Sequence, residues 1–365
     1  MSVRLCAAGA LTGVLVLALA APATAEPAGQ RVRLVSEQII GKITFQGTTV
    51  GGLSGLDYDR RTGEWVLICD DRSDRQPVRY YTARRGEQGF ELTGTKPLLR
   101  PDGSTYPKLS LDTPDPEEIR VDPLTGDLWW TSEGDRLPPL VIDPAIRRAH
   151  RDGSFAGELP LPANLRMSTD ERGPRRNEVL EGLAFAAGGR LVVSTVEGPL
   201  IQDGPSPTPA AGALGRISVQ TRSGQLLAQY AYPMEKVFAE PVPAGAFANN
   251  GVVAILPVTE QDPHRFLVME RSFVTGVGNK VRIYEITTAG ASNVKNVDSL
   301  AGAEIRPVRK KLLADLGTLG LSTVDNVEGM TWGPRLPSGE RSLVLVSDDN
   351  FSATQVSQII TLAVR

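Results

Sequence analysis

A short sequence unit recurs along the chain and constrains the fold more than any other feature. Each copy opens with an acid or a serine, continues through an apolar run, a glycine-containing turn and a second, more apolar run, and closes with an acid. Three copies have the same length, and the last is longer because of its turn. The copies run from Ser54 to Asp70, Glu117 to Glu133, Glu181 to Glu197 and Glu328 to Asp348, with a weaker one from Val252 to Glu270.

Two apolar runs joined by a tight turn predict a β-hairpin, and further strand-like runs lie between the units. Four or more strands per period of about 45 to 65 residues are typical of propeller blades, whereas a β-sandwich leaves the repeat unexplained. We therefore predict an all-β fold with a single β-propeller of five to seven blades, six from the length. The strand-like run 31–40 is expected to complete the last blade and close the ring.

Composition excludes several classes of protein. The 365 residues carry 39 Lys plus Arg and 42 Asp plus Glu, and this net charge of -3 argues against a nucleic-acid surface. A hydrophobic content of 41% argues against a disordered chain. We expect a monomer with a small-molecule ligand and no nucleic-acid partner.

Residues 1–25 have the pattern of a cleavable secretory signal. Arg4 precedes an apolar stretch over 5–21, and Ala23-Thr24-Ala25 gives the small-x-small cleavage pattern. A membrane anchor is the alternative, but the stretch is broken by Gly and Thr and falls short of the roughly 20 apolar residues of a spanning helix. We expect residues 26–365 to form one propeller domain that is periplasmic or secreted, with no membrane attachment after cleavage and with Cys69 buried.

The opening and closing acids predict a metal site. The first strand of each blade lines a propeller's channel, so acids at the strand ends of several blades converge. Crowded carboxylates repel one another, and a hard cation such as Ca²⁺ or Mg²⁺ relieves the repulsion. With 2 His and 2 Cys in all, a His/Cys zinc set is excluded. Ordinary turn residues are the alternative. The predicted metal ligands are Asp70, Glu117, Glu133, Glu181, Glu197, Glu270, Glu328 and Asp348.

Arginines follow several of these acids, among them Arg79 and Arg271. An arginine beside bound cations is suited to hold a phosphate group through two hydrogen bonds. The alternative is that these arginines form ion pairs with the acids. The sequence shows no Ser-His-Asp arrangement, no P-loop and no dinucleotide-binding fingerprint.

Four stretches of the chain resemble the phytase-like family labelled "esterase-like activity of phytase", a group of exported bacterial β-propeller proteins. The chain departs from the family pattern at Glu118, where glycine is usual, and at Cys69, where serine is common. The stretches are 52–56 with 70–72 and 77–80, 116–117 with 130–133, 177–183 with 197–200, and 325–329 with 347–351.

The resemblance implies a phosphate-ester hydrolase similar to calcium-dependent propeller phytases, in which carboxylate-bound Ca²⁺ binds the phosphate and activates a water. On this hypothesis Glu181 and Glu328 belong to the catalytic centre, and Arg79 and Arg271 hold the phosphate of a phosphomonoester. A calcium-dependent lactonase or arylesterase is a second hypothesis, with Asn177 and Asn326 as amide ligands. A non-catalytic exported propeller that binds a partner or ligand is the third.

Overall fold

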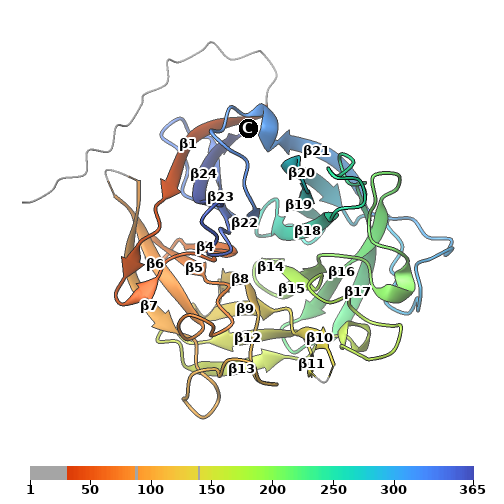
Figure 1. The fold of residues 1–365 in the computed structure, drawn as a ribbon, viewed down its shortest axis with the longest axis horizontal. Helices are drawn as coiled ribbons and strands as arrows, with labels where there is room; N and C mark the ends of the chain where they lie inside the picture. The colour runs from red at the N-terminus through yellow and green to blue at the C-terminus, as the bar shows by residue number, and fades with distance from the viewer. Residues whose placement is uncertain (1–30, 87–88, 139) are drawn as a thin grey trace, which may run out of the picture. The chain divides into compact units, whose positions relative to one another are not determined.

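The computed structural model describes residues 31–86, 89–138 and 140–365, and these residues form five four-stranded antiparallel sheets (Figure 1). The predicted signal segment lies outside the described residues. In the part of the chain that is described, no helix is long and apolar enough to cross a membrane. The helical elements found there are the 3-10 turns η1 (Ala163–Leu165), η2 (Ile201–Asp203) and η3 (Leu316–Thr318).

Each sheet is one blade of a propeller, and the strands of a blade follow one another outward from the centre of the ring. Blade 1 comprises β4 (Gly55–Asp59), β5 (Glu64–Ile68), β6 (Arg79–Gly86) and β7 (Gly89–Pro97). Blade 2 comprises β8 (Pro116–Val121), β9 (Leu128–Ser132), β12 (Ala145–Ala149) and β13 (Phe155–Leu159). Blade 3 comprises β14 (Leu180–Ala186), β15 (Leu191–Val196), β16 (Ala213–Thr221) and β17 (Leu226–Met234). Blade 4 comprises β18 (Ala248–Pro257), β19 (Arg265–Val274), β20 (Gly278–Thr287) and β21 (Arg309–Asp315).

Blade 5 contains both ends of the described chain. Its strands are β22 (Val327–Trp332), β23 (Arg341–Ser347), β24 (Ser357–Val364) and, on the outside, β1 (Val32–Ile40). β1 pairs antiparallel with β24, and the Arg365 amide donates a hydrogen bond to the Arg31 carbonyl at 3.0 Å. This confirms the predicted closure of the ring by the early strand (Figure 1).

The second strands of the blades are apolar at nearly every position because both of their faces are covered. Between blades 4 and 5, for example, Met269 and Ile283 pack in one buried cluster with Leu345 and Ile360. Cys69, which follows β5, is fully buried as predicted, and its thiol contacts the Gly51 carbonyl at 3.1 Å.

The propeller has five blades; this lies within the predicted range but differs from the six expected from length. The additional length is in connections rather than in a further sheet. Residues 98–115 join blades 1 and 2, and residues 288–308 join β20 to β21. A small hairpin of β10 (Asp135–Leu137) and β11 (Leu140–Ile142) is inserted in blade 2, and β2 (Thr44–Phe45) pairs with β3 (Thr48–Thr49) ahead of blade 1.

Arg120 fills the centre of the ring. From β8 its guanidinium donates to the carbonyl of Leu183 at 2.6 Å, that of Leu56 at 2.8 Å and that of Met330 at 3.0 Å. One side chain thereby joins the inner strands of blades 1, 2, 3 and 5. It also forms an ion pair of 2.6 Å with Glu118.

Glu118, the departure from the family pattern, is the counterion of this central arginine. Both side chains are almost completely buried. Space for the Glu118 carboxyl comes from Gly55 in the neighbouring blade, where an added Cβ would lie 2.6 Å from Glu118 Oε1. Burial raises the pKa of Glu118 to about 8 although Arg120 acts in the opposite direction. The Arg120–Glu118 pair is therefore a plug that closes the channel between the inner strands.

Candidate metal centre

Glutamates project into the ring from bulges at the start of three inner strands. The pairing of each inner strand with its neighbour shifts between Pro116 and Ile119 in β8, between Leu180 and Gly182 in β14, and between Val327 and Gly329 in β22. A bulge leaves the extra residue out of the ladder and redirects its side chain. These extra residues include Glu117, Glu181 and Glu328, which are the predicted opening acids.

The closing acids meet them at the same end of the ring. In four blades the second strand ends and an acid follows within two residues. The antiparallel turn of each hairpin brings this acid back to the start of the inner strand, beside the bulge. These residues are Asp70, Glu133, Glu197 and Asp348.

Asp115 is an eighth member of this group that the sequence analysis missed. It lies in the loop before β8, outside the recurring hairpin, and its carboxyl is hydrogen-bonded to that of Asp70. Two carboxyls in contact require a shared proton or a cation. The only signal for Asp115 in the sequence is its position in Asp-Pro-Glu, directly ahead of Glu117. We call the following residues the acid cluster: Asp70, Asp115, Glu117, Glu133, Glu181, Glu197, Glu328 and Asp348.

Burial raises the pKa of every carboxyl in the acid cluster. The neighbouring acids raise the pKa further for Asp70, Glu117, Glu133, Glu181 and Asp348, whose pKa values all lie well above the usual range. The pKa of Glu197 rises to about 7, with burial outweighing the favourable charge of Arg271. Crowding at this end of the ring thus makes the charged forms costly without a cation.

Two sets of three carboxyls have the geometry of cation ligands. Asp70, Asp115 and Glu117 offer oxygens that lie within 4.8 Å of one another, and so do Glu117, Glu133 and Glu181. Glu117 belongs to both sets. The donor atoms are all oxygens, which suits Ca²⁺ or Mg²⁺. On the chemistry of the donors and their spacing, the acid cluster fits divalent cations.

Blade 4 departs from this pattern and contributes an arginine instead of acids. Its bulge lies between Val252 and Ala254, so Val253 occupies the place of the opening glutamate. Val252 pairs with Glu270, and the residue that follows the pair is Arg271. Arg271 therefore takes the place of the closing acid.

The Arg271 side chain points into the acid cluster. Its Nη2 lies 3.0 Å from Glu197 Oε1 and 3.3 Å from Glu328 Oε1. Its Nε is buried and has no hydrogen-bond partner among the described residues. Arg271 thus forms the ion pairs with the acids that the sequence analysis gave as the alternative, and one N–H of its guanidinium has no acceptor among the described residues.

Glu270, a predicted metal ligand, does not join the acid cluster. Adjacent residues of a strand face opposite ways, so the side chain points away from Arg271. Its carboxylate accepts hydrogen bonds from the Tyr232 hydroxyl at 2.6 Å and from Asn250 Nδ2 at 2.8 Å, and it pairs with Lys310 at 2.6 Å. The sequence analysis took Glu270 as the closing acid. The bulge in β18 shifts the register by one residue, so Arg271 occupies that position instead.

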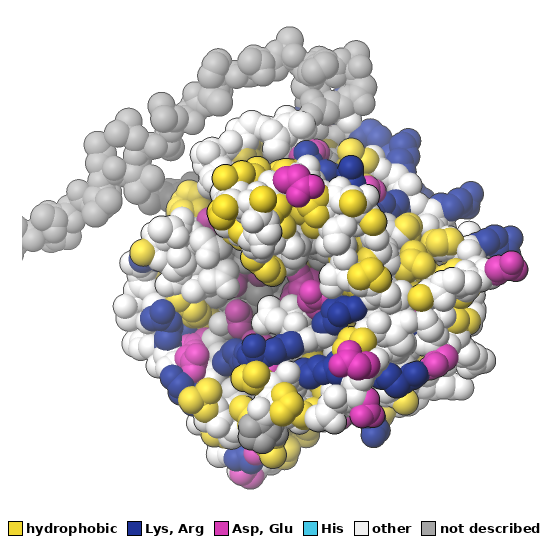
Figure 2. Space-filling view, turned by 45° about the vertical axis from the view of Figure 1, so that its right-hand side comes forward, with side chains coloured by type: hydrophobic (Ala, Val, Ile, Leu, Met, Phe, Trp, Pro, Cys, Tyr) yellow, Lys and Arg dark blue, Asp and Glu magenta, His cyan; other side chains and the backbone are white. Residues whose placement is uncertain are grey.

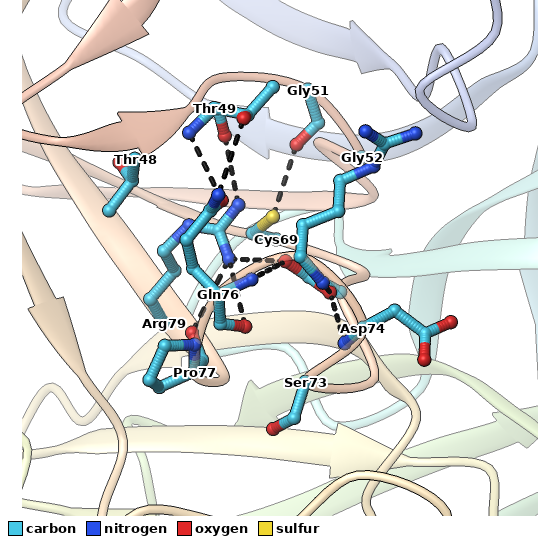
Figure 3. A network of polar contacts seen from close by, with 12 residues as sticks. Thr48, Thr49, Gly51, Gly52, Cys69, Ser73, Asp74, Gln76, Pro77 and Arg79 are labelled. Atoms are coloured by element: carbon cyan, nitrogen blue, oxygen red, sulfur yellow. Dashed lines mark hydrogen bonds and ion pairs between the residues drawn. The ribbon is translucent and has the colours of Figure 1, made fainter.

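Arg79, predicted to hold phosphate, is instead part of a structural network (Figure 3). Its guanidinium donates to Asp71 at 2.6 Å, to the Tyr81 hydroxyl at 2.8 Å and to the Thr49 carbonyl at 2.8 Å. The residue is 2% exposed. Burial raises the pKa of Asp71, but hydrogen bonds from the Arg75 and Gln76 amides and from Arg79 outweigh it and hold that pKa below its usual value. Arg79 thus has no free donor directed at the acid cluster.

Replacement of Arg79 by lysine tests this structural role. A lysine retains a charge for Asp71 but loses the fork that reaches Tyr81 and Thr49, so we expect a loss of about 2 kcal/mol in the free energy of unfolding. Urea denaturation measures the loss. Any calcium affinity that is measured for the parent protein is expected to stay unchanged. Weaker calcium binding by an intact Arg79→Lys protein would place Arg79 in the centre after all.

Basic side chains lie beside part of the acid cluster. Arg72 contacts Asp115 and Asp135, each at 3.1 Å, and Arg176 contacts Asp135 at 2.8 Å. On the face drawn in Figure 2, acidic side chains lie in a hollow next to a group of Lys and Arg side chains. Of the two amides considered as ligands, Asn326 donates to Glu328 Oε1 at 3.0 Å, whereas Asn177 is exposed.

Several solved structures have low similarity to this chain. They include a periplasmic gluconolactonase of Pseudomonas aeruginosa (12% identity, 87% of this chain and 90% of that chain covered, TM-score 0.37). A putative exo-β-1,3-galactanase of Bifidobacterium bifidum has 11% identity, coverage of 86% and 88%, and a TM-score of 0.41. The Cps50 (Swd1) propeller domain of Myceliophteria thermophila has 10% identity, coverage of 90% and 100%, and a TM-score of 0.39.

No curated protein matches the sequence. A family model, however, matches most of the chain. The model is described as phytase-like, "Esterase-like activity of phytase", and it covers residues 48–351. This range includes the inner strands of all five blades and every member of the acid cluster. The chain belongs to the phytase-like family.

Proposed function

We propose that this protein is a calcium-dependent hydrolase of phosphomonoesters. The observation that supports the proposal is the acid cluster: eight carboxyls from four blades and one loop meet at one end of the ring, with oxygens spaced for cations. Membership of the phytase-like family favours phosphate esters as the substrate class.

In this proposal the acid cluster provides two sets of cation ligands. Asp70, Asp115 and Glu117 would hold one divalent cation, and Glu133 and Glu181 with Glu117 would hold a second. A bound divalent cation supplies Lewis-acid stabilisation of the phosphate and lowers the pKa of a bound water. The neighbouring blades keep the carboxyls in place. For example, the Val179 amide donates to Glu133 Oε1 at 2.5 Å.

Arg271 and Glu328 form the other side of the centre. Arg271 is held by Glu197 and Glu328, and its unpartnered Nε is available to a phosphate oxygen. Glu328 is oriented by Asn326 and Arg271, and its pKa is raised by burial, so it is suited to accept a proton from an attacking water. Arg79 is not part of the proposed catalytic centre.

Phosphate release from a panel of phosphomonoesters, measured with Ca²⁺ and again with EGTA, tests the proposal. We expect activity only with Ca²⁺, and a loss of about 100-fold in kcat/KM for Glu181→Gln, since this change removes a charged ligand. Glu158→Gln is the matched control, because that side chain is 52% exposed on the outermost strand of blade 2.

Two outcomes would overturn the proposal. Carboxyl-ester or lactone turnover without phosphate release would favour the lactonase hypothesis, although the plug occupies the channel where a single deep ion would lie. Calcium binding with no turnover of any ester would indicate a non-catalytic binding protein.

A further inference from the structure

A second cavity lies at the opposite end of the inner strands from the acid cluster. Its volume is about 360 Å³, and residues of all five inner strands line it. The lining residues Arg120, Ala184 and Thr331 each follow a bulge glutamate by three positions. Three residues of extended strand span about 10 Å. The plug of Arg120 and Glu118 lies between the two sites, so this cavity is separate from the acid cluster.

The walls of the cavity are apolar and partly aromatic. They include Phe185, Leu256, Pro257 and Trp332. The Trp332 indole N–H donates to the Pro257 carbonyl at 2.9 Å, which fixes the ring in place. A concave site of this size with aromatic walls is typical of sites for small organic molecules.

The floor of the cavity carries one carboxylate with unused acceptor capacity. Asp57 Oδ1 accepts from the Thr331 hydroxyl at 2.6 Å, and Oδ2 accepts from the Val121 amide at 2.8 Å. Each oxygen retains a second acceptor position. Arg120 does not neutralise Asp57 closely, because its Nη1 lies 3.9 Å from Oδ1 and its closest contacts are to Glu118 and the three carbonyls.

Two ion pairs lie on the rim. Arg60 pairs with Glu260 at 2.9 Å between blades 1 and 4, and Arg61 pairs with Asp59 at 3.1 Å. Arg120 is paired with Glu118 beneath the floor, and this leaves Asp57 as the lining carboxylate with free acceptor positions. These positions favour a charged N–H donor at the bottom of an apolar pocket.

We propose that this cavity is a second ligand site and that it binds a small aromatic amine, with the ring against the apolar walls and the ammonium group on Asp57. The site serves recognition and is independent of the phosphoester chemistry at the other end of the ring. No activity assigned to the acid cluster requires it.

Calorimetric titration of the full chain with tryptamine and with indole tests the proposal. Both probes offer the same ring, and only tryptamine carries an ammonium group. We expect tryptamine to bind at least about tenfold more tightly, because the bond to Asp57 is charge-assisted. Asp57→Asn is expected to reduce the affinity for tryptamine to that for indole, and to leave the affinity for indole unchanged. EGTA should affect neither titration.

A pair of surface variants locates the site without disturbing the floor. Leu124 lines the mouth and is 56% exposed, and Leu111 is 63% exposed and does not line the cavity. Leu124→Trp is expected to weaken the binding of both probes, and Leu111→Trp is expected to leave the binding of both unchanged. Absence of binding, equal affinity for the two probes, or binding that Leu124→Trp leaves intact would each overturn the proposal.

Discussion

Replacement of Arg120 by methionine is expected to lower the free energy of unfolding by about 3–5 kcal/mol, the usual cost of breaking a buried ion pair. The change leaves Glu118 buried without its counterion. It also leaves the Leu56, Leu183 and Met330 carbonyls without their donor. Since these groups lie on the inner strands of four blades, the loss affects the whole ring. Urea denaturation of both proteins measures the difference.

Two further variants identify the cause of that loss. Arg84→Met changes the same residue type on an exposed position of β6 and is expected to have little effect. Adding Glu118→Gln to Arg120→Met replaces the buried carboxyl that has lost its partner by a neutral amide, so we expect the double variant to recover part of the stability. A small effect of Arg120→Met alone would show that the plug does not join the blades.

Without divalent cations, the free energy of unfolding is expected to fall as the pH rises from about 5 to about 8. A carboxyl whose pKa is raised in the folded protein binds more protons there than in the unfolded chain. Its stabilising contribution is complete below the unfolded pKa and is lost as the pH rises through the folded one. For Glu197, a rise from 4.5 to about 7 corresponds to roughly 3 kcal/mol at pH 7.

Calcium is expected to reverse this loss, because a bound cation compensates the charged carboxylates. At a hundredfold excess over Kd the stabilisation is about 2.7 kcal/mol. Urea titrations from pH 5 to pH 8, with EGTA and with Ca²⁺, measure both effects. Glu197→Gln should flatten the pH dependence and Glu158→Gln should not. Stability that rises over this interval in EGTA would contradict the assignment of raised pKa values.

The recurring hairpin made most of the fold predictable from sequence. Its glycine turns and apolar runs located the first two strands of each blade, including the weak copy around Val252. The number of blades was harder to predict, because it depends on how many residues lie in the connections between strands. Residues 98–115 and 288–308 have no strand pattern, and length alone cannot assign them.

The site was predictable where the repeat is regular and not where it is broken. Glu117, Glu181 and Glu328 recur at equivalent positions, and the bulges that direct them inward belong to the repeat. Glu270 and Arg271 differ by one position, and a one-residue shift moves a side chain to the other face. Asp115 lies on a connection, so the periodicity carries no information about it.

The pairing of β1 with β24 has a consequence for synthesis on the ribosome. β1 is synthesised more than 300 residues before its partner strand. At about 5–20 residues per second, β1 waits for tens of seconds with an open edge. Open edges invite pairing with other chains, and charged side chains reduce that tendency. Arg33 and Glu37 of β1 are charges of this kind, and we expect them to reduce such pairing until β24 has been synthesised.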